Sequence, residues 1–306
     1  MRAPGFVVAA LVPAFLFLGC FYLYPVVFNV GNSLTDTTLF QLRTGGHFVG
    51  AANYKELLGS RDFFRVLWNT AFWLTFVGVS VRVVMGLGLA LALHSKVIAR
   101  LRMRTLSRVL ILVPWATPPI VSIVIWRWML DARVGEVNKY LLSWGWIDQP
   151  IAFLGTASWV WPALILIITW NTLPLMALAF LASLQSMPEE LVEAANIDGA
   201  TPLQIVRYIY LPHLKPTIIV MVLMSTFWTF NNFVYVWLTT GAGPGYYTNV
   251  MATEVYIKAF IDGRLGYSSA VGVVMALLMG AFGILYLRIV RERRLGTAGT
   301  PAALTS

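Results

Sequence analysis

The sequence predicts an all-α polytopic membrane protein, and three observations support this fold class. Of the 306 residues, 58% are hydrophobic and only 11% are charged, with a mean hydropathy of +0.75. Six apolar stretches are each long enough to cross a bilayer as a helix. The net charge of +9 comes from basic residues beside these stretches. That arrangement follows the positive-inside rule and does not resemble a nucleic-acid-binding surface.

We expect one transmembrane domain over residues 1–306. Its spans are predicted at residues 6–30, 67–93, 107–130, 158–183, 216–238 and 268–289, with a helical elbow at 187–212. The first span has no charge and is too long for a cleaved signal peptide, so we expect it to be retained. Its Cys20 is the only cysteine, which excludes an intramolecular disulfide and a cysteine-based metal site. The three histidines are too widely separated to support a metal cluster.

Residues 32–65 read as a loop outside the membrane that ends in a short amphipathic helix. The second span, 67–93, contains a single charge, Arg82. A basic segment without acids follows at 94–108 and is expected to face the cytoplasm.

The third span contains Pro114, Pro118 and Pro119. Prolines at this density break the helical hydrogen-bond ladder, which a membrane tolerates only where protein or a polar cavity compensates. The loop at 131–150 carries aromatic residues suited to a membrane interface. The fourth span occupies the long uncharged interval before Glu189, and its Pro174 leaves the carbonyl of Trp170 without its helical donor.

The elbow carries the sequence EAANIDGATPLQIVRYIYLP at 193–212. Gly199 is suited to end a helix with a positive φ. Thr201 and Pro202 then provide the cap and the first residue of a second helix, which we expect to end at Leu211–Pro212. Small side chains of this elbow would let another protein approach the backbone closely.

The fifth span is followed by a Gly- and Tyr-rich loop at 239–267, and the sixth ends in a cluster of arginines. Six spans place both termini on the same side of the membrane. Lysine and arginine are more numerous on that side, so we predict that both termini and the elbow are cytoplasmic.

The elbow resembles the EAA motif of permease subunits in bacterial ABC importers: EAA, three residues, Gly, nine residues, Ile, any residue, Leu-Pro. Every defined position matches, at Glu193, Ala194, Ala195, Gly199, Ile209, Leu211 and Pro212. The alternative is an ordinary amphipathic helix with a glycine cap. Seven matching positions within twenty residues favour the motif.

A second stretch, FWTFNNFVYVWLTTGAGP at 227–244, is similar to a segment of sugar-importer permeases of the maltose and glycerol-phosphate type. The likeness extends from about residue 50 to 290. The turn at 240–244 departs from the usual spacing by one residue, and Pro119 replaces a polar residue. The substrate therefore need not be maltose.

The resemblance implies a type I ABC importer permease fold. It also implies the permease subunit of an ATP-driven, binding-protein-dependent sugar importer, in which the chain forms half of the translocation pathway. The implied partners are a homologous second permease subunit, two ATPase subunits and an extracytoplasmic substrate-binding protein. The chain lacks the GxxxxGK[ST] motif. We therefore expect a transport subunit of the bacterial inner membrane that binds no cofactor itself, with ATP and Mg²⁺ on the partner ATPases.

The elbow would couple to an ATPase through a set of acidic and small residues. These are Glu190, Glu193, Ala194, Ala195, Asp198, Gly199 and Ala200.

A sugar path needs aromatic faces together with amides or hydroxyls. Helical spacing places Ser225, Trp228, Asn232 and Tyr235 on one face, and Trp115, Pro119, Ser122 and Trp126 on another. By the resemblance, Asn232 matches a sugar-contacting asparagine, and Thr229, Trp228, Trp115 and Asn171 occupy neighbouring contact positions. The predicted substrate-binding residues are thus Asn232, Trp228, Thr229, Trp115, Asn171, Ser225 and Tyr235. Alternatively, these polar groups are contacts between helices, worth roughly 0.6–2 kcal/mol each.

Arg82 has two interpretations. It meets an anionic sugar substituent or a partner subunit, or it snorkels or bonds a backbone carbonyl. An ion-coupled transporter or channel would need Asp, Glu or His in the span cores, which the sequence lacks. A membrane enzyme would need paired carboxylates, a metal cluster or an activated nucleophile, whereas the outer loops carry scattered acids. The sequence leaves the sugar open: disaccharide, monosaccharide, or a sulfonated or phosphorylated derivative.

Overall fold

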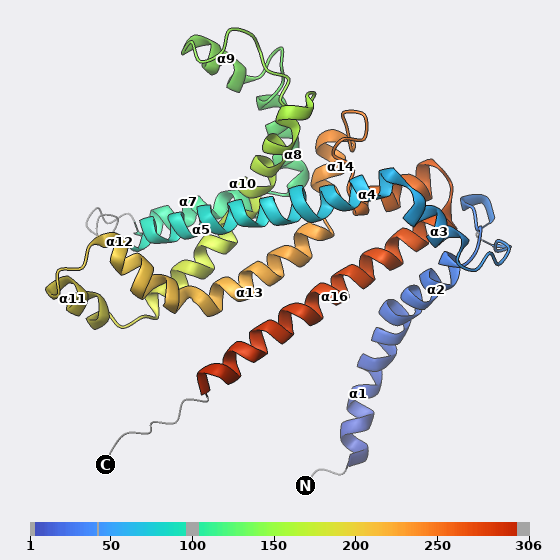
Figure 1. The fold of residues 1–306 in the computed structure, drawn as a ribbon, viewed down its shortest axis with the longest axis horizontal. Coiled ribbons are helices and arrows are strands. Elements are labelled where there is room, and N and C mark those ends of the chain that lie inside the picture. Colours follow the sequence, from blue (N-terminus) through green and yellow to red (C-terminus); the bar gives the residue numbers. More distant parts are fainter. Residues whose placement is uncertain (1–3, 42, 96–103, 299–306) are drawn as a thin grey trace. The chain divides into compact units, whose positions relative to one another are not determined.

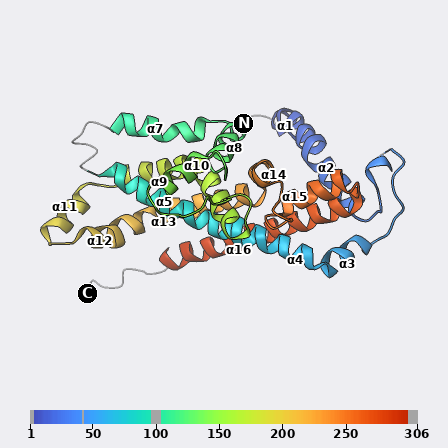
Figure 2. The same ribbon diagram turned by 90° about the horizontal axis from the view of Figure 1, so that it is seen from above.

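The computed structural model describes residues 4–41, 43–95 and 104–298, and its helices are shown in Figures 1 and 2. The chain divides into two compact units, which are described separately. The first comprises Met1–Val66 and Met251–Ser306, and the second comprises Leu67–Val250. Lys96, Arg100 and Arg102 of the expected cytoplasmic segment lie outside the described residues.

Within the described part, five helices are long and apolar enough to cross a membrane. They are Ala10–Ser33, Arg61–His94, Ala157–Gln185, Pro202–Phe230 and Leu265–Arg288. Two more apolar helices, Leu106–Ala116 and Pro119–Met129, meet at a bend of 92° and make a sixth span if the pair is counted as one. The bend lies at Thr117–Pro118, where the proline cluster predicts a break.

The first unit contains α1 (Pro4–Leu18), η1 (Gly19–Leu23), α2 (Tyr24–Ser33), α3 (Ala52–Gly59), α15 (Met251–Tyr256), η5 (Ile257–Ile261) and α16 (Leu265–Ala298). Helix α16 packs against α2, α3 and α15. A Cβ at Gly266 would lie 1.9 Å from the carbonyl oxygen of Thr35, so only glycine permits this approach. Arg264 holds Glu56 with two bonds of 2.7 and 2.6 Å, which ties the start of α16 to α3.

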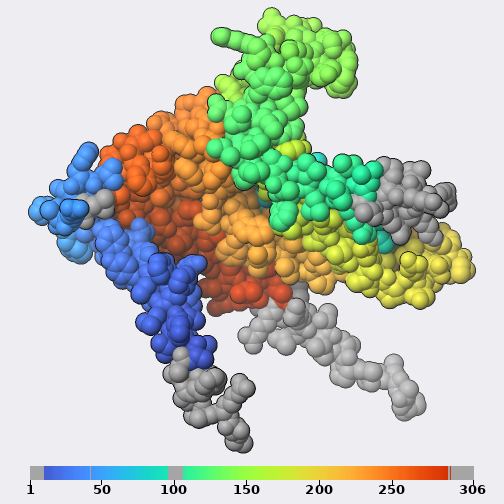
Figure 3. Space-filling view, turned by 180° about the vertical axis from the view of Figure 1, so that it is seen from behind, coloured from blue at the N-terminus to red at the C-terminus, as the bar shows by residue number. Residues whose placement is uncertain are grey.

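The second unit contains η3 (Asn69–Val77), α5 (Gly78–His94), α7 (Arg104–Ala116), α8 (Pro119–Met129), α9 (Glu136–Ser143), α10 (Ala157–Gln185), α11 (Glu190–Ile197), α12 (Pro202–Ile205), η4 (Val206–Tyr210), α13 (Leu211–Phe230) and α14 (Val234–Thr240). Helix α10 packs against α5 and crosses it in the view of Figure 1. In the space-filling view the green residues around α9 stand out from the other helices of this unit (Figure 3).

Close packing of α5 on α10 depends on Gly86. A Cβ there would lie 3.2 Å from Met176 and 3.4 Å from Phe180. Small residues allow helix backbones to approach in membrane proteins, where dispersion contacts replace the hydrophobic drive between helices. This close packing holds α5 and α10 together, and the ends of both helices border the candidate site.

Helix α4 (Arg61–Trp68) begins inside the loop predicted at 32–65. Two further loops contain helices that the sequence analysis did not anticipate: α9 in the segment 131–150, and α15 with η5 in 239–267. These helices are short and lie between turn-forming residues, so their apolar periodicity was too brief to predict a helix.

The second helix of the elbow does not end at Leu211–Pro212, and that prediction is wrong. The helix passes through a π turn, η4, directly into α13, with Pro212 in the first turn of α13. A π turn shifts the hydrogen-bond register, so the chain can carry a residue without an N–H and remain helical.

Candidate functional site

The elbow has the local chemistry expected from its sequence. Gly199 follows the end of α11 with a φ of +79°. The N–H of Ala200 donates to the Ala195 carbonyl at 2.9 Å, and that of Gly199 donates to Asn196 at 3.1 Å. These two bonds form a Schellman motif, which satisfies the last carbonyls of the helix.

The second elbow helix begins with a capping box. The Thr201 hydroxyl accepts from the Gln204 N–H, and the Gln204 side chain accepts from the Thr201 N–H at 2.6 Å. Pro202 occupies the first helical turn, as predicted. The turn between the helices is therefore fixed by its own sequence and needs no partner to form it.

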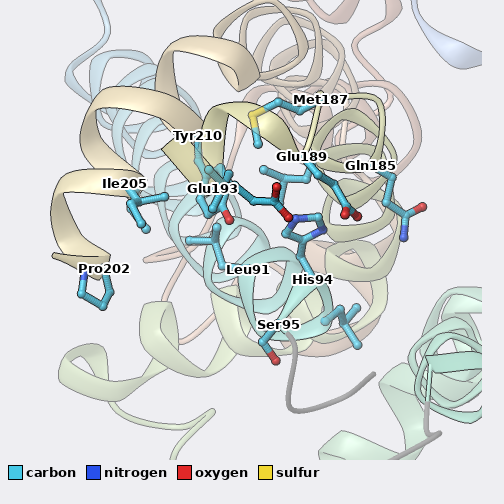
Figure 4. Close-up of a pocket in the computed structure, with 14 residues that line it drawn as sticks. Leu91, His94, Ser95, Gln185, Met187, Glu189, Glu193, Pro202, Ile205 and Tyr210 are labelled. Carbon is cyan, nitrogen blue, oxygen red and sulfur yellow. The ribbon is translucent and has the colours of Figure 1, made fainter. Parts of the chain in front are cut away.

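Two hollows flank the elbow. The larger, of about 680 Å³, lies between the elbow and the ends of α5 and α10, and Glu189, Glu193, His94 and Tyr210 border it (Figure 4). The smaller, of about 310 Å³, is bordered by the small residues of the turn. Those are Ala195, Gly199 and Ala200, together with Asp198. Their short side chains leave this space open to another molecule.

The elbow exposes several large apolar side chains, which the surface of a protein without a partner would bury. Leu191 is 53% exposed, Ile197 86%, Leu203 76% and Tyr208 67%. Glu190, Glu193, Ala194 and Asp198 are also exposed. Exposed apolar side chains rimmed by acidic residues are typical of a protein-binding surface.

The base of the elbow is firmly packed. Leu93 of α5, Leu184 of α10 and Leu214 of α13 belong to one buried cluster. The Ser183 carbonyl lies 2.9 Å from His213 Nε2, and the Ser183 hydroxyl accepts from Thr217 at 3.0 Å. Displacement of the elbow would therefore move the ends of three spans together.

A hydrogen-bond hub around Asn171 stabilises the broken third span. Its Nδ2 donates to the carbonyls of Pro114 at 2.7 Å and Thr117 at 3.2 Å, and to the Ser122 hydroxyl at 3.1 Å. Pro118 has no N–H with which to bond the Pro114 carbonyl. The amide replaces that missing donor, as backbone in a membrane requires.

The hub also includes α14, because the Tyr235 hydroxyl donates to Asn171 Oδ1. Both residues are buried and their polar groups bond protein. Of the two interpretations that the sequence leaves open for Asn171 and Tyr235, this geometry favours the contact between helices.

Arg82 is buried and bonds within its own unit. Its Nε donates to the Gly78 carbonyl at 3.0 Å, and its Nη2 donates to the Thr229 hydroxyl. The carbonyl partner matches one of the expectations for this charge. The bond to Thr229 joins α5 to α13 near the end of the latter.

Helix α13 ends at Phe230, and α14 begins at Val234. Asn231 Nδ2 donates to the Phe227 carbonyl at 2.9 Å, and Asn232 Oδ1 accepts from the Tyr235 N–H at 3.2 Å. Asparagine side chains here replace backbone partners, which ends one helix and starts the next. The predicted continuous span at 216–238 is therefore interrupted.

The break overturns the predicted helical face of Ser225, Trp228, Asn232 and Tyr235. Ser225 is buried, whereas Trp228 is 54% exposed, and the other two residues lie beyond the helix end. The bend of 92° separates Trp115 from the face predicted for it with Pro119, Ser122 and Trp126, which lie together in α8. Of the predicted substrate-binding residues, Trp228 and Trp115 are exposed and Asn232 is half-buried, whereas Thr229, Asn171, Ser225 and Tyr235 are buried.

Sequence reasoning missed Asn69. Its buried Nδ2 donates at 2.9 Å to the carbonyls of both Tyr247 and Asn249, which fixes the segment after the turn at 240–244. An asparagine at the start of an apolar run was a signal that could have identified it. Among the described residues, no three His, Cys, Asp or Glu side chains gather as a metal site.

Comparison with known proteins gives matches over most of the chain. The family described as "Binding-protein-dependent transport system inner membrane component" matches residues 82–295. The chain is 36% identical to the trehalose/maltose transport system permease protein MalF of Thermococcus litoralis, over 81% of each chain. It is 34% identical to the sulfoquinovosyl glycerol transport system permease protein SmoG of Agrobacterium fabrum, over 94% of this chain and 90% of that protein.

A solved structure is also similar. It is a chain of a bacterial alginate ABC transporter in complex with an alginate pentasaccharide-bound periplasmic protein. The TM-score is 0.77 at 23% identity, over 94% of each chain. At this identity the likeness shows a shared fold.

Proposed function

Since the chain belongs to the family of inner membrane components of binding-protein-dependent transport systems, we propose that it is the permease subunit of an ATP-driven sugar importer. It is a multi-pass helical membrane protein with the type I ABC importer permease fold. The observation that carries the coupling role is the elbow, a self-capped turn with apolar and small residues exposed on a packed base. The relatives named for trehalose, maltose and sulfoquinovosyl glycerol support a sugar as the substrate.

The proposed assembly contains this chain, a homologous second permease, two ATPase subunits and an extracytoplasmic binding protein. In support, the similar alginate transporter was solved with a periplasmic protein bound. ATP and Mg²⁺ would be held by the ATPases, and this chain would bind no cofactor. The elbow and both termini would lie in the cytoplasm, in keeping with the distribution of basic residues.

In the proposed mechanism, α11 sits in a groove of an ATPase, with Gly199 and Ala200 allowing close approach. Closure of the ATPases pushes the elbow. Because Leu93, Leu184 and Leu214 pack together at its base, the push moves α5, α10 and α13 as one body. The far end of α13 carries Trp228, and the break at 231–233 carries Asn232, so the same motion alters the sugar path.

The substrate contacts we propose are Trp228, Asn232 and Trp115, whose side chains are available in this structure. Asn232 Nδ2 has no protein partner within the described part of the chain, so it can donate to a sugar hydroxyl. The other four predicted residues are buried and would stabilise the helices that line this path. They are Thr229, Asn171, Ser225 and Tyr235. Thr229 bonds Arg82, and Tyr235 bonds Asn171.

The test is sugar uptake by the purified complex in proteoliposomes, with the binding protein outside and ATP inside. We expect uptake that requires both the binding protein and ATP hydrolysis. Uptake driven by an ion gradient without ATP would contradict the proposal. The ion-coupled transporter alternative would then be favoured.

A further inference from the structure

A cavity of unit 2 lies at the end of α10 opposite to the elbow. Its volume is about 630 Å³, and the last turns of α8 and α14 and the segments 130–134 and 152–155 border it. Helix α10 starts just after this cavity and runs for 29 residues to Gln185 at the larger elbow hollow. At 1.5 Å per residue this separates the two by about 43 Å. The cavity thus lies on the membrane side from which an importer takes its substrate.

Two opposite charges border this cavity. Arg127 Nη1 donates to the Leu238 carbonyl in the last turn of α14 at 3.1 Å, which fixes the guanidinium while leaving further N–H groups for a ligand. Asp131 Oδ1 accepts from the N–H groups of Arg133 at 2.8 Å and Val134 at 3.0 Å. The bond from Val134, followed by that from Arg133, lowers the pKa of Asp131, which is therefore an ionised acceptor at neutral pH.

The same cavity has an aromatic wall and a hydroxyl without a partner. The Trp128 side chain borders it and is 53% exposed. Thr239 also borders it and is buried, and its hydroxyl bonds no atom of the described residues. Proteins rarely leave a buried hydroxyl in this state unless water or a ligand supplies the bond.

We infer that the cavity bordered by Arg127, Trp128, Asp131 and Thr239 is a subsite for a neutral pyranose sugar. This inference rests on the proposed sugar-import function and adds a second point of contact, separate from Asn232. A pyranose offers apolar ring faces to the tryptophan and hydroxyl groups to the guanidinium and the carboxylate, as sugar-sized polar sites require. Because the cationic Arg127 and the anionic Asp131 border the same cavity, an uncharged ring can bond to both, whereas a charged substituent of either sign would meet a like charge at one of them.

The test uses the complex of this chain with its second permease and ATPases, in lipid nanodiscs and without the binding protein. Saturation-transfer NMR is recorded with maltose, trehalose, methyl α-glucoside and the sugar that the same complex imports. We expect transfer to at least one of them, and weaker transfer in Trp128→Ala, in which the contacts proposed at Asn232 remain. Thr239→Val should weaken binding about fivefold, the effect of one neutral hydrogen bond, without lowering the melting temperature.

Trp144→Ala is the matched control, because Trp144 is 61% exposed and does not border the cavity. If Trp128 only anchors the chain at the membrane interface, both variants will bind sugar like the wild type, and the inference is overturned. It is also overturned if the wild-type complex imports a sugar but shows no transfer to any of the four probes. A complex that imports no sugar at all contradicts the proposed function, which is a different result.

Discussion

At the scale of single residues, the buried amides of this chain stabilise breaks in helices. Asn171 replaces the donor that Pro118 lacks, and Asn232 caps α14 just after α13 has ended. Polar residues inside spans are commonly taken as substrate contacts. Here burial separates the structural amide from the proposed sugar contact: Asn171 is 5% exposed, whereas Asn232 is half-buried.

Asn171→Ala should destabilise the second unit. It leaves the carbonyls of Pro114 and Thr117 without their side-chain donor, at a penalty of about 1–3 kcal/mol for an unsatisfied buried group. Thermal unfolding in detergent measures the loss. Asn231→Ala is the control, because its amide is exposed and bonds only the Phe227 carbonyl. Equal melting temperatures for the two variants would show that the hub does not stabilise the bend.

Asn232→Ala should leave assembly intact and lower sugar-stimulated transport. The removed Nδ2 has no protein partner within the described residues, and the lost cap of α14 is a single bond of 3.2 Å. We expect the KM for sugar to rise about tenfold, as for one or two lost hydrogen bonds. Uptake kinetics in proteoliposomes report the change. Kinetics identical to wild type would remove Asn232 from the sugar path.

At the scale of elements, the elbow combines a rigid turn with an open surface. Its turn is fixed by the positive φ of Gly199 and by the capping box of Thr201. A Cβ at Gly199 would meet no atom within 4 Å. Substitutions at Gly199 can therefore distinguish two effects: strain in the backbone, which any side chain causes, and obstruction of the docking surface, which only a large side chain causes.

Gly199→Ala and Gly199→Arg form a matched pair. Each should strain the turn by about 1–2 kcal/mol, because an L-residue with a side chain disfavours a positive φ. Only the arginine fills the small hollow beside Ala195, so only Gly199→Arg should lose the ATPase on affinity purification. Glu193→Arg should lose it as well, through charge reversal. Wild-type yields of complex from both arginine variants would exclude the coupling role.

The ion pair between α3 and the start of α16 predicts a small effect of pH. The bonds from Arg264 lower the pKa of Glu56 below its usual range. Its stabilising contribution is therefore complete above the unfolded-state pKa and is lost as the pH falls through the folded-state pKa. Because both side chains are partly exposed, the contribution should be below about 1 kcal/mol.

Thermal unfolding of wild type and Glu56→Gln at pH 7 and near pH 3 measures this contribution. The variant should melt slightly below the wild type at pH 7, and the difference should vanish in acid. A difference that persists or grows in acid has the wrong sign for this ion pair.

At the scale of the whole molecule, sequence reasoning reached the helical class and the elbow because both depend on local chemistry. Apolar length identifies spans, and Gly199, Thr201 and Pro202 determine a turn without help from distant residues. Which residues share a helical face could not be predicted from local chemistry. The predicted faces assumed straight helices, whereas the bend of 92° and the break at 231–233 redirect the chain.

The sequence also could not predict which of the polar residues are buried, namely Thr229, Asn171, Ser225 and Tyr235. Three of these side chains bond to helices far away in the chain: Thr229 to α5, Asn171 to α8 and Tyr235 to α10. Spacing within one helix contains no information about such partners. It therefore named polar residues of the proposed path but could not separate exposed side chains from buried ones.

Affinity purification of this chain from native membranes in mild detergent, with identification of the bound proteins, tests the central claim most directly. The claim is that the elbow couples this permease to ATPases in a larger importer. We expect a nucleotide-binding ATPase and a second six-span permease to be recovered with the chain, and less ATPase to be recovered with Gly199→Arg. Recovery of this chain alone, with transport activity in liposomes that needs no ATP, would contradict the account.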